Sequence, residues 1–66
     1  MKNYRTSEQF AEICESAING NWNQAFREGF EAGFYAQDLI KHYEEESNGI
    51  EFEDLVYLAE GIQKLR

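Results

Sequence analysis

Apolar residues recur along this chain at intervals of three and four positions, the spacing that places side chains on one face of an α-helix. The pattern is interrupted at Asn19-Gly20, at Gly33 and at Ser47-Asn48-Gly49, and the chain contains no proline. The sequence therefore predicts four short helices. We expect them to form an all-α, compact bundle, with residues 1–66 making a single helical domain.

Local signals indicate where these helices begin and which side chains they bury. Thr6 and Gln9 have the spacing of a capping box, and Asn21 is expected to begin the second helix. Ile50 and Leu55 are spaced as a hydrophobic staple around the start of the last helix, near Glu51. The four expected apolar faces are Phe10, Ile13, Cys14, Ala17 and Ile18; Trp22, Ala25, Phe26 and Phe30; Ala36, Leu39, Ile40 and Tyr43; and Leu55, Leu58, Ala59, Ile62 and Leu65.

The charge is strongly acidic and unevenly distributed. Thirteen acidic residues against six basic ones give a formal net charge of −7, and residues 28–60 hold ten of the acids and only one base, Lys41. Such a surface repels nucleic acid and lipid headgroups and favours basic partners. We therefore expect no direct binding to nucleic acid or membranes, and the helix-turn-helix-like spacing of residues 29–43 does not change this expectation.

The residues that carry chemistry in enzymes are scarce here. Cys14 lies on an expected apolar face and has no second cysteine to pair with, which indicates a reducing, cytoplasmic location. His42 is the only histidine and is expected at the surface. Neither a phosphate-binding loop nor a nucleophile motif occurs. We expect a protein that is not an enzyme and that uses no catalytic residue, cofactor or metal.

The stretch "HYEEESNGIEFEDL" (residues 42–55) holds six carboxylates in fourteen positions. Glu51, Glu53 and Asp54 fall at the start of the last helix, where the helix dipole stabilises anions by about 0.3–1 kcal/mol each. Residues 44–46 fall at the end of the preceding helix, where the same dipole disfavours them. Helix stability therefore explains the second half of the stretch, whereas the first half indicates a functional role.

Part of this stretch, "EEESNGIEFEDL", resembles the calcium loop of EF-hand proteins. The resemblance implies Glu44, Glu46 and Asn48 as early ligands, Gly49 as the sharp turn and Asp54 as the closing carboxylate. The loop lacks one residue after the glycine, and the closing residue is an aspartate where the family has a glutamate. A degenerate calcium-binding module is therefore a lesser alternative.

A tiny, proline-free, helical and strongly acidic chain resembles the anti-defence proteins of phages and mobile elements, the anti-CRISPR and antirestriction inhibitors. The run "NGNWNQAF" (residues 19–26) is also similar to a segment of one Cas9-inhibiting anti-CRISPR. The resemblance implies a stoichiometric protein inhibitor that occupies a nucleic-acid site, without catalysis or cofactor. If the protein is phage-encoded, it would act in the host cytoplasm.

We expect this protein to bind a basic, nucleic-acid-recognising surface of a CRISPR–Cas effector or restriction enzyme through an acidic, nucleic-acid-mimicking face. The expected contact residues are Glu44, Glu45, Glu46, Glu51, Glu53 and Asp54, with Glu28, Glu31 and Asp38 as extensions. Trp22, Phe34 and Tyr35 are candidate aromatic anchors if they are exposed, although such residues more often belong to the core in so small a domain. The main alternative is a small adaptor that binds a host protein through exposed aromatics. A homodimer is possible, because so small a core gains from doubling.

Overall fold

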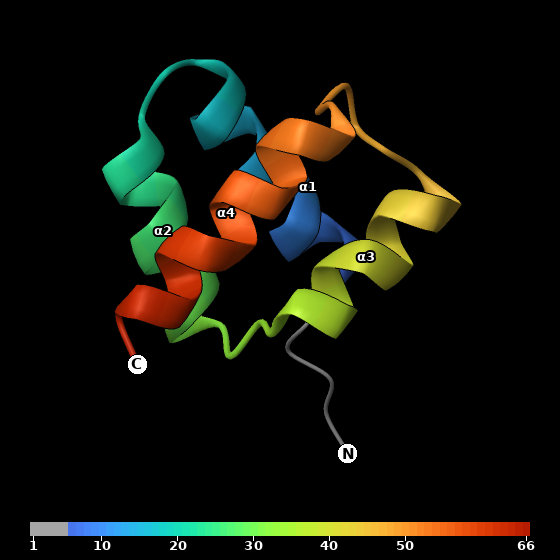
Figure 1. Ribbon diagram of the computed structural model, residues 1–66. Helices are drawn as coiled ribbons and strands as arrows, with labels where there is room; N and C mark the ends of the chain where they lie inside the picture. Colours follow the sequence, from blue (N-terminus) through green and yellow to red (C-terminus); the bar gives the residue numbers. More distant parts are fainter. Residues whose placement is uncertain (1–5) are drawn as a thin grey trace.

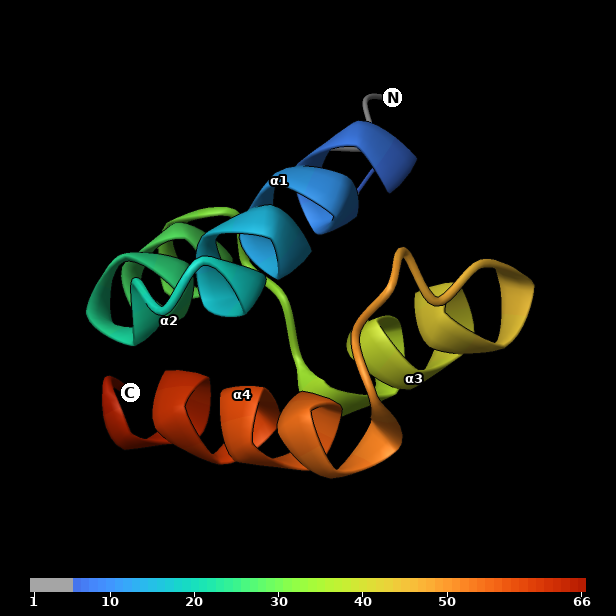
Figure 2. The same ribbon diagram turned by 90° about the horizontal axis from the view of Figure 1, so that it is seen from above.

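Four helices account for most of the computed structural model, which describes residues 6–66 (Figure 1). They are α1 (Ser7–Ile18), α2 (Trp22–Glu31), α3 (Ala36–Glu45) and α4 (Phe52–Lys64), and no strand occurs in this part of the chain. Figure 2 shows α1 and α2 on one side of the molecule and α4 on the other, with α3 beside the first half of α4. The prediction of an all-α bundle of four short helices is confirmed.

The predicted helix boundaries agree with the structure, although not every predicted cap forms. The backbone N–H of Gln9 donates to Thr6 Oγ1 at 3.2 Å, and the Thr6 N–H donates to Gln9 Oε1 at 2.9 Å, which confirms the capping box. Asn21 and Glu51 occupy N-cap positions but make no side-chain cap hydrogen bond. The predicted breaks contain three glycines with φ between 82° and 88°, namely Gly20, Gly33 and Gly49.

A single cluster of apolar side chains forms the core between the helices. Its buried members are Phe10, Ile13, Cys14, Ala17, Ala25, Phe34, Leu39, Ile50, Leu55, Leu58 and Ile62. Five residues of the predicted apolar faces are instead exposed: Ile18, Phe30, Ala36, Ile40 and Leu65. Ile18 and Leu65 lie at helix ends, beyond the cover of neighbouring helices, and Ile40 lies on the side of α3 that turns away from the core.

Helices α2 and α4 approach each other closely through a reciprocal pair of glycines. A Cβ atom on Gly29 of α2 would overlap the side chain of Ile62, and one on Gly61 of α4 would overlap the ring of Phe26. Each glycine therefore makes room for a large side chain of the opposite helix. This contact fixes which side of α4 faces the core and which side faces outward.

No helix in residues 6–66 is both long enough and apolar enough to cross a lipid bilayer.

Candidate partner-binding site

Six carboxylates surround the connection between α3 and α4, and all six side chains are exposed. This group, which we call the acidic turn, consists of Glu44, Glu45, Glu46, Glu51, Glu53 and Asp54. Within residues 6–66, none of the six carboxylate groups has a hydrogen-bond or ion-pair partner. The structure therefore places the six residues of the expected main contact around one connection, and their carboxylates have no partner in the described part of the chain.

Local backbone geometry gives the acidic turn its shape. Asn48 and Gly49 both have positive φ values, 55° and 84°, so the chain reverses direction at these two residues. Asn48 Nδ2 donates to the backbone carbonyl of Glu46 at 3.1 Å, and the Ile50 N–H donates to the carbonyl of Ser47 at 3.2 Å. The side chain of Ile50 is buried in the core. The carboxylates are thus carried by a connection that is hydrogen-bonded within itself and anchored by one apolar residue.

The two sides of the acidic turn differ in their helix electrostatics, as the sequence indicated. Glu53 and Asp54 lie in the first turn of α4, where the dipole stabilises each anion by about 0.3–1 kcal/mol. Glu44 and Glu45 are the last residues of α3 and Glu46 is its C-cap, where unpaired carbonyls disfavour negative charge. Within residues 6–66, these last three carboxylates therefore have neither a side-chain partner nor a favourable helix dipole.

The carboxylates at the end of α3 face a groove against α1. Glu45 and Glu46 line this groove together with Glu8, so the first turn of α1 adds a further acid. His42, expected at the surface, is half-buried in the same groove and stacks on Phe10 with ring centres 5.1 Å apart. The sequence missed both features, because helix periodicity does not show which helices become neighbours.

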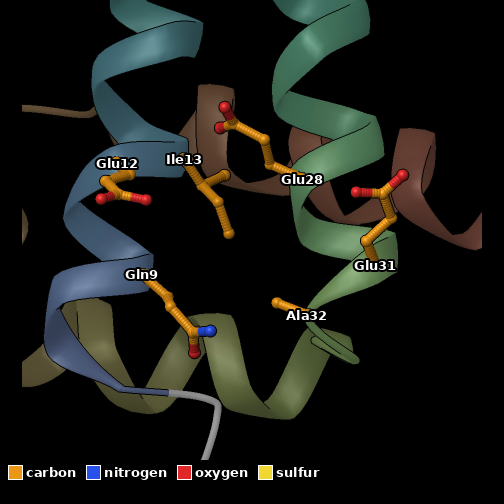
Figure 3. Close-up of a pocket in the computed structure, with 6 residues that line it drawn as sticks. All are labelled: Gln9, Glu12, Ile13, Glu28, Glu31 and Ala32. Carbon is orange, nitrogen blue, oxygen red and sulfur yellow. The ribbon is translucent and has the colours of Figure 1, made fainter.

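Glu28 and Glu31 lie elsewhere, in a groove between α1 and α2 (Figure 3). They line this groove together with Glu12, Gln9, Ile13 and Ala32. The carboxylate of Glu28 already accepts hydrogen bonds from Ser16 Oγ at 3.1 Å and from Gln24 Nε2 at 2.9 Å. These two predicted extensions therefore belong to a second acidic groove and not to the acidic turn.

The third predicted extension, Asp38, serves the start of α3. Its Oδ2 atom accepts a hydrogen bond from the backbone N–H of Tyr35 at 2.9 Å, and its side chain is half-buried. At a rise of 1.5 Å per residue, Asp38 lies about 10 Å from Glu45 along the helix axis. It contributes to helix capping at the end of α3 opposite the acidic turn.

The three candidate aromatic anchors have different environments. Phe34 is fully buried and belongs to the core, which is the alternative environment that the small size of the domain favoured, so it is not an anchor. Trp22 is half-buried against Tyr57, with ring centres 4.8 Å apart in an edge-to-face arrangement. Tyr35 is exposed, and the Arg66 guanidinium lies 3.9 Å from its ring centre. Only Tyr35 is an exposed aromatic anchor of the kind expected.

Other large apolar side chains are exposed on α3 and α4, and the sequence analysis did not single them out as surface residues. They are Ile40, Phe52, Val56 and Tyr57. The signal was present in α4, whose sequence "FEDLVYLAEGIQK" carries apolar residues on more than one side of the helix. A helix that packs with one side against a small core must leave such additional residues at the surface.

Groups suited to catalysis or metal binding are sparse in the described chain. Cys14 is buried in the core, and burial raises the pKa of its thiol to about 11, so the reactive thiolate is disfavoured at neutral pH. Among residues 6–66, no three histidine, cysteine, aspartate or glutamate side chains lie close enough together to hold a metal ion. The geometry supplies surface charge and apolar contact area, which are means of binding a partner.

Comparisons with known proteins found no matching protein family, no matching curated protein and no matching solved structure.

Proposed function

We propose that this protein is a stoichiometric inhibitor of the anti-CRISPR or antirestriction type, which binds a basic, nucleic-acid-recognising surface of a bacterial defence complex. One observation carries the proposal. Six exposed carboxylates of the acidic turn have no partner within residues 6–66, and residues 44–46 lie where the dipole of α3 disfavours them. Their charge is available to lysine and arginine side chains of another protein.

The chemistry of such a complex follows from the charge. A channel that grips nucleic acid carries lysine and arginine side chains spaced to meet phosphates. Carboxylates held at the end of one helix, in a connection and at the start of the next offer anions at several positions on one rigid support. Attraction between surfaces of opposite charge accelerates their encounter and selects the basic partner. A chain with a net charge of −7 is repelled by the nucleic acid itself.

The test is inhibition of DNA cleavage by a panel of purified CRISPR–Cas effectors and restriction enzymes. The variant Glu44→Lys, Glu45→Lys, Glu46→Lys is compared with a control, Glu12→Lys, Glu15→Lys, Asn19→Lys, Asn23→Lys, whose four side chains are also exposed and lie outside the expected contact. Both variants change the formal net charge of −7 by the same amount. Inhibition should be lost in the first variant and retained in the control.

The order of addition supplies a second criterion. An inhibitor that occupies a nucleic-acid site should block cleavage when it is added before the DNA, and should act weakly when it is added afterwards. Equal inhibition by both charge variants and the wild type, at near-physiological salt, would show that the acidic turn is not the contact. If no member of the panel is inhibited at all, the anti-defence function itself fails.

A second candidate function is a small adaptor that binds a host protein through exposed aromatic side chains. It is supported by the exposure of Tyr35 and Tyr57, because tyrosine is a frequent anchor residue in protein–protein interfaces. The two functions differ in their dependence on ionic strength. Binding by the acidic turn should weaken steeply as salt is added, whereas binding by aromatic contacts should change little and should instead be lost in Tyr35→Ala, Tyr57→Ala.

A further inference from the structure

A row of apolar side chains, four of them exposed and two half-buried, runs along the boundary between α3 and α4. On α3 it consists of Ala36, Ile40 and Tyr43, and on α4 of Phe52, Val56 and Ala59, which we together call the apolar seam. In each helix the three residues are spaced i, i+4 and i+7, so they share one side of that helix. The exposed fractions of Ile40, Val56 and Phe52 are 41%, 41% and 52%.

Contacts at both ends show that the two rows face the same boundary. Near the acidic turn, the rings of Tyr43 and Phe52 lie with their centres 5.7 Å apart. At the other end, Ala36 and Ala59 line a common apolar groove, which Glu60, Gln63 and Lys64 complete. Ile40 and Val56 lie between these ends. Figure 1 looks onto this side of the molecule, with α4 in front and α3 beside it.

The seam has the dimensions and pattern of a helix-binding groove. Seven residue steps of 1.5 Å give each row a length of about 10 Å, which matches two turns of a partner helix. Grooves that bind amphipathic helices present apolar residues to anchors spaced three and four residues apart. Large exposed apolar patches with a polar rim mark interaction sites on folded proteins.

Charged residues at the edge of the seam identify the kind of partner. In the sequence Glu44 adjoins Tyr43, Glu53 adjoins Phe52 and Lys41 adjoins Ile40, and both Glu60 and Lys64 line the groove beside Ala59. Positive charge is limited in residues 36–66 to Lys41, Lys64 and Arg66, against eight acids. Arg66 is already engaged, since it donates to the carbonyl of Phe34 at 2.6 Å. The surroundings of the seam are therefore acidic.

We infer that the apolar seam binds an amphipathic helix of a partner protein, with apolar anchors on one face and lysine or arginine on the flanks. A second copy of this chain fits less well. Two copies would each bring a net charge of −7, and a symmetric contact would place acidic edge against acidic edge. This inference rests on the proposed function only in taking the partner to be a basic protein, and it assigns the apolar part of the contact.

The test uses a synthetic peptide of roughly 18 residues, about five helical turns, with leucine at one face and lysine on both flanks. Affinity is measured by fluorescence anisotropy of the labelled peptide. The variant Ile40→Ser, Val56→Ser should weaken binding at least about tenfold, because it places hydroxyls where the anchors dock. The control Ile18→Ser, Leu65→Ser changes two residues outside the seam that are somewhat more exposed, 55% and 47%, and should stay within about twofold of wild type.

Other outcomes overturn the inference. Binding that survives in the seam variant, or equal binding of a scrambled peptide with the same charge and no apolar face, would show that charge alone attracts the peptide. A wild-type dimer in sedimentation equilibrium that Ile40→Ser, Val56→Ser converts to a monomer would make the occupant a second copy. If the serine pair fails to fold, as judged by circular dichroism, Ile40→Ala, Val56→Ala replaces it.

The result can be separated from that of the proposed function. Peptide binding through the seam without inhibition of any defence enzyme would retain this inference and reject the anti-defence function. Inhibition that depends on residues 44–46 but not on Ile40 and Val56 would retain the anti-defence function and reject the apolar seam as part of the contact.

Discussion

Helices α1 and α3 carry apolar residues in similar patterns, and the fold uses them differently. In α1 four of the five expected apolar residues are buried, Ile18 being the exception. In α3 only Leu39 is buried, and Ile40 is 41% exposed. α1 packs mainly against α2 and touches α3, whereas α3 is covered chiefly by α4. An apolar pattern therefore predicts a helix and its phase, while the extent of its contact with neighbouring helices decides how much of that pattern is covered.

This difference shows which apolar surface of the protein is not needed for its core. Apolar area on α1 is used to hold the domain together. The outer apolar residues of α3 and α4 contribute little to the core and are available to a partner. Four predictions test this comparison.

The largest expected effect is the difference in stability between a variant of a core residue in α1 and a variant of an exposed residue in α4. Phe10→Ala removes a side chain that is 1% exposed, and should lower the free energy of unfolding by about 3–5 kcal/mol. Phe52→Ala removes one that is half exposed, and should cost less than about 1 kcal/mol. Urea unfolding followed by circular dichroism measures both. Similar losses in the two variants would mean that the outer residues of α4 are part of the stabilising core.

The next effect concerns the contact that orients α4. Gly61→Ala places a methyl group against the ring of Phe26 and should cost about 1–3 kcal/mol, despite the better helix propensity of alanine. Glu60→Ala, one residue earlier and exposed, is the control and should change stability by less than about 0.5 kcal/mol. Thermal melts of both variants provide the measurement. A stabilised Gly61→Ala variant would contradict the close approach of α2 and α4.

Helix caps give a smaller difference between the two halves of the molecule. Thr6→Ala breaks the reciprocal capping box of α1 and should lower the free energy of unfolding by about 1 kcal/mol. Glu51 caps α4 without a side-chain hydrogen bond, so Glu51→Ser should raise the free energy of unfolding by up to about 1 kcal/mol. Chemical unfolding curves measure both changes. Loss of stability in both variants would indicate that Glu51 supports the fold in a way its geometry does not reveal.

The smallest effect is a pH dependence that arises from α1. Burial raises the pKa of Cys14 from 9.0 to about 11, so the unfolded chain loses this proton at a lower pH than the folded protein does. The contribution of the buried neutral thiol to the free energy of unfolding is fully present below pH 9 and is lost as the pH rises from 9 towards 11. The difference in free energy of unfolding between wild type and Cys14→Ala, measured from unfolding curves, should therefore be smaller at pH 10 than at pH 8. A constant difference between them would exclude this contribution.

The sequence predicted the helices, their breaks and most of the core because these depend on local spacing. The capping box of Thr6, the glycine turns and the staple residue Ile50 were all identified from neighbours in the chain. The exposure of residues 44–46 could likewise be expected from charge alone.

The arrangement of the surface could not be obtained in this way. Glu28 and Glu31 were assigned as extensions of the acidic turn, yet they face α1, because sequence gives the phase of a helix and not its neighbours. For the same reason His42 was expected at the surface and instead stacks on Phe10. The apolar seam combines residues from two helices whose pairing is a property of the folded chain.

The aromatic contact between α2 and α4 has a consequence for spectroscopy. Trp22 is the only tryptophan in the chain. Its ring packs against that of Phe26, which is also in α2, and against that of Tyr57 in α4. The apolar seam lies on the α3 side of the same helix. Intrinsic fluorescence excited at the indole should therefore report whether α2 and α4 are docked, and should respond little to a ligand in the seam. A single unlabelled sample can thus separate loss of structure from loss of binding.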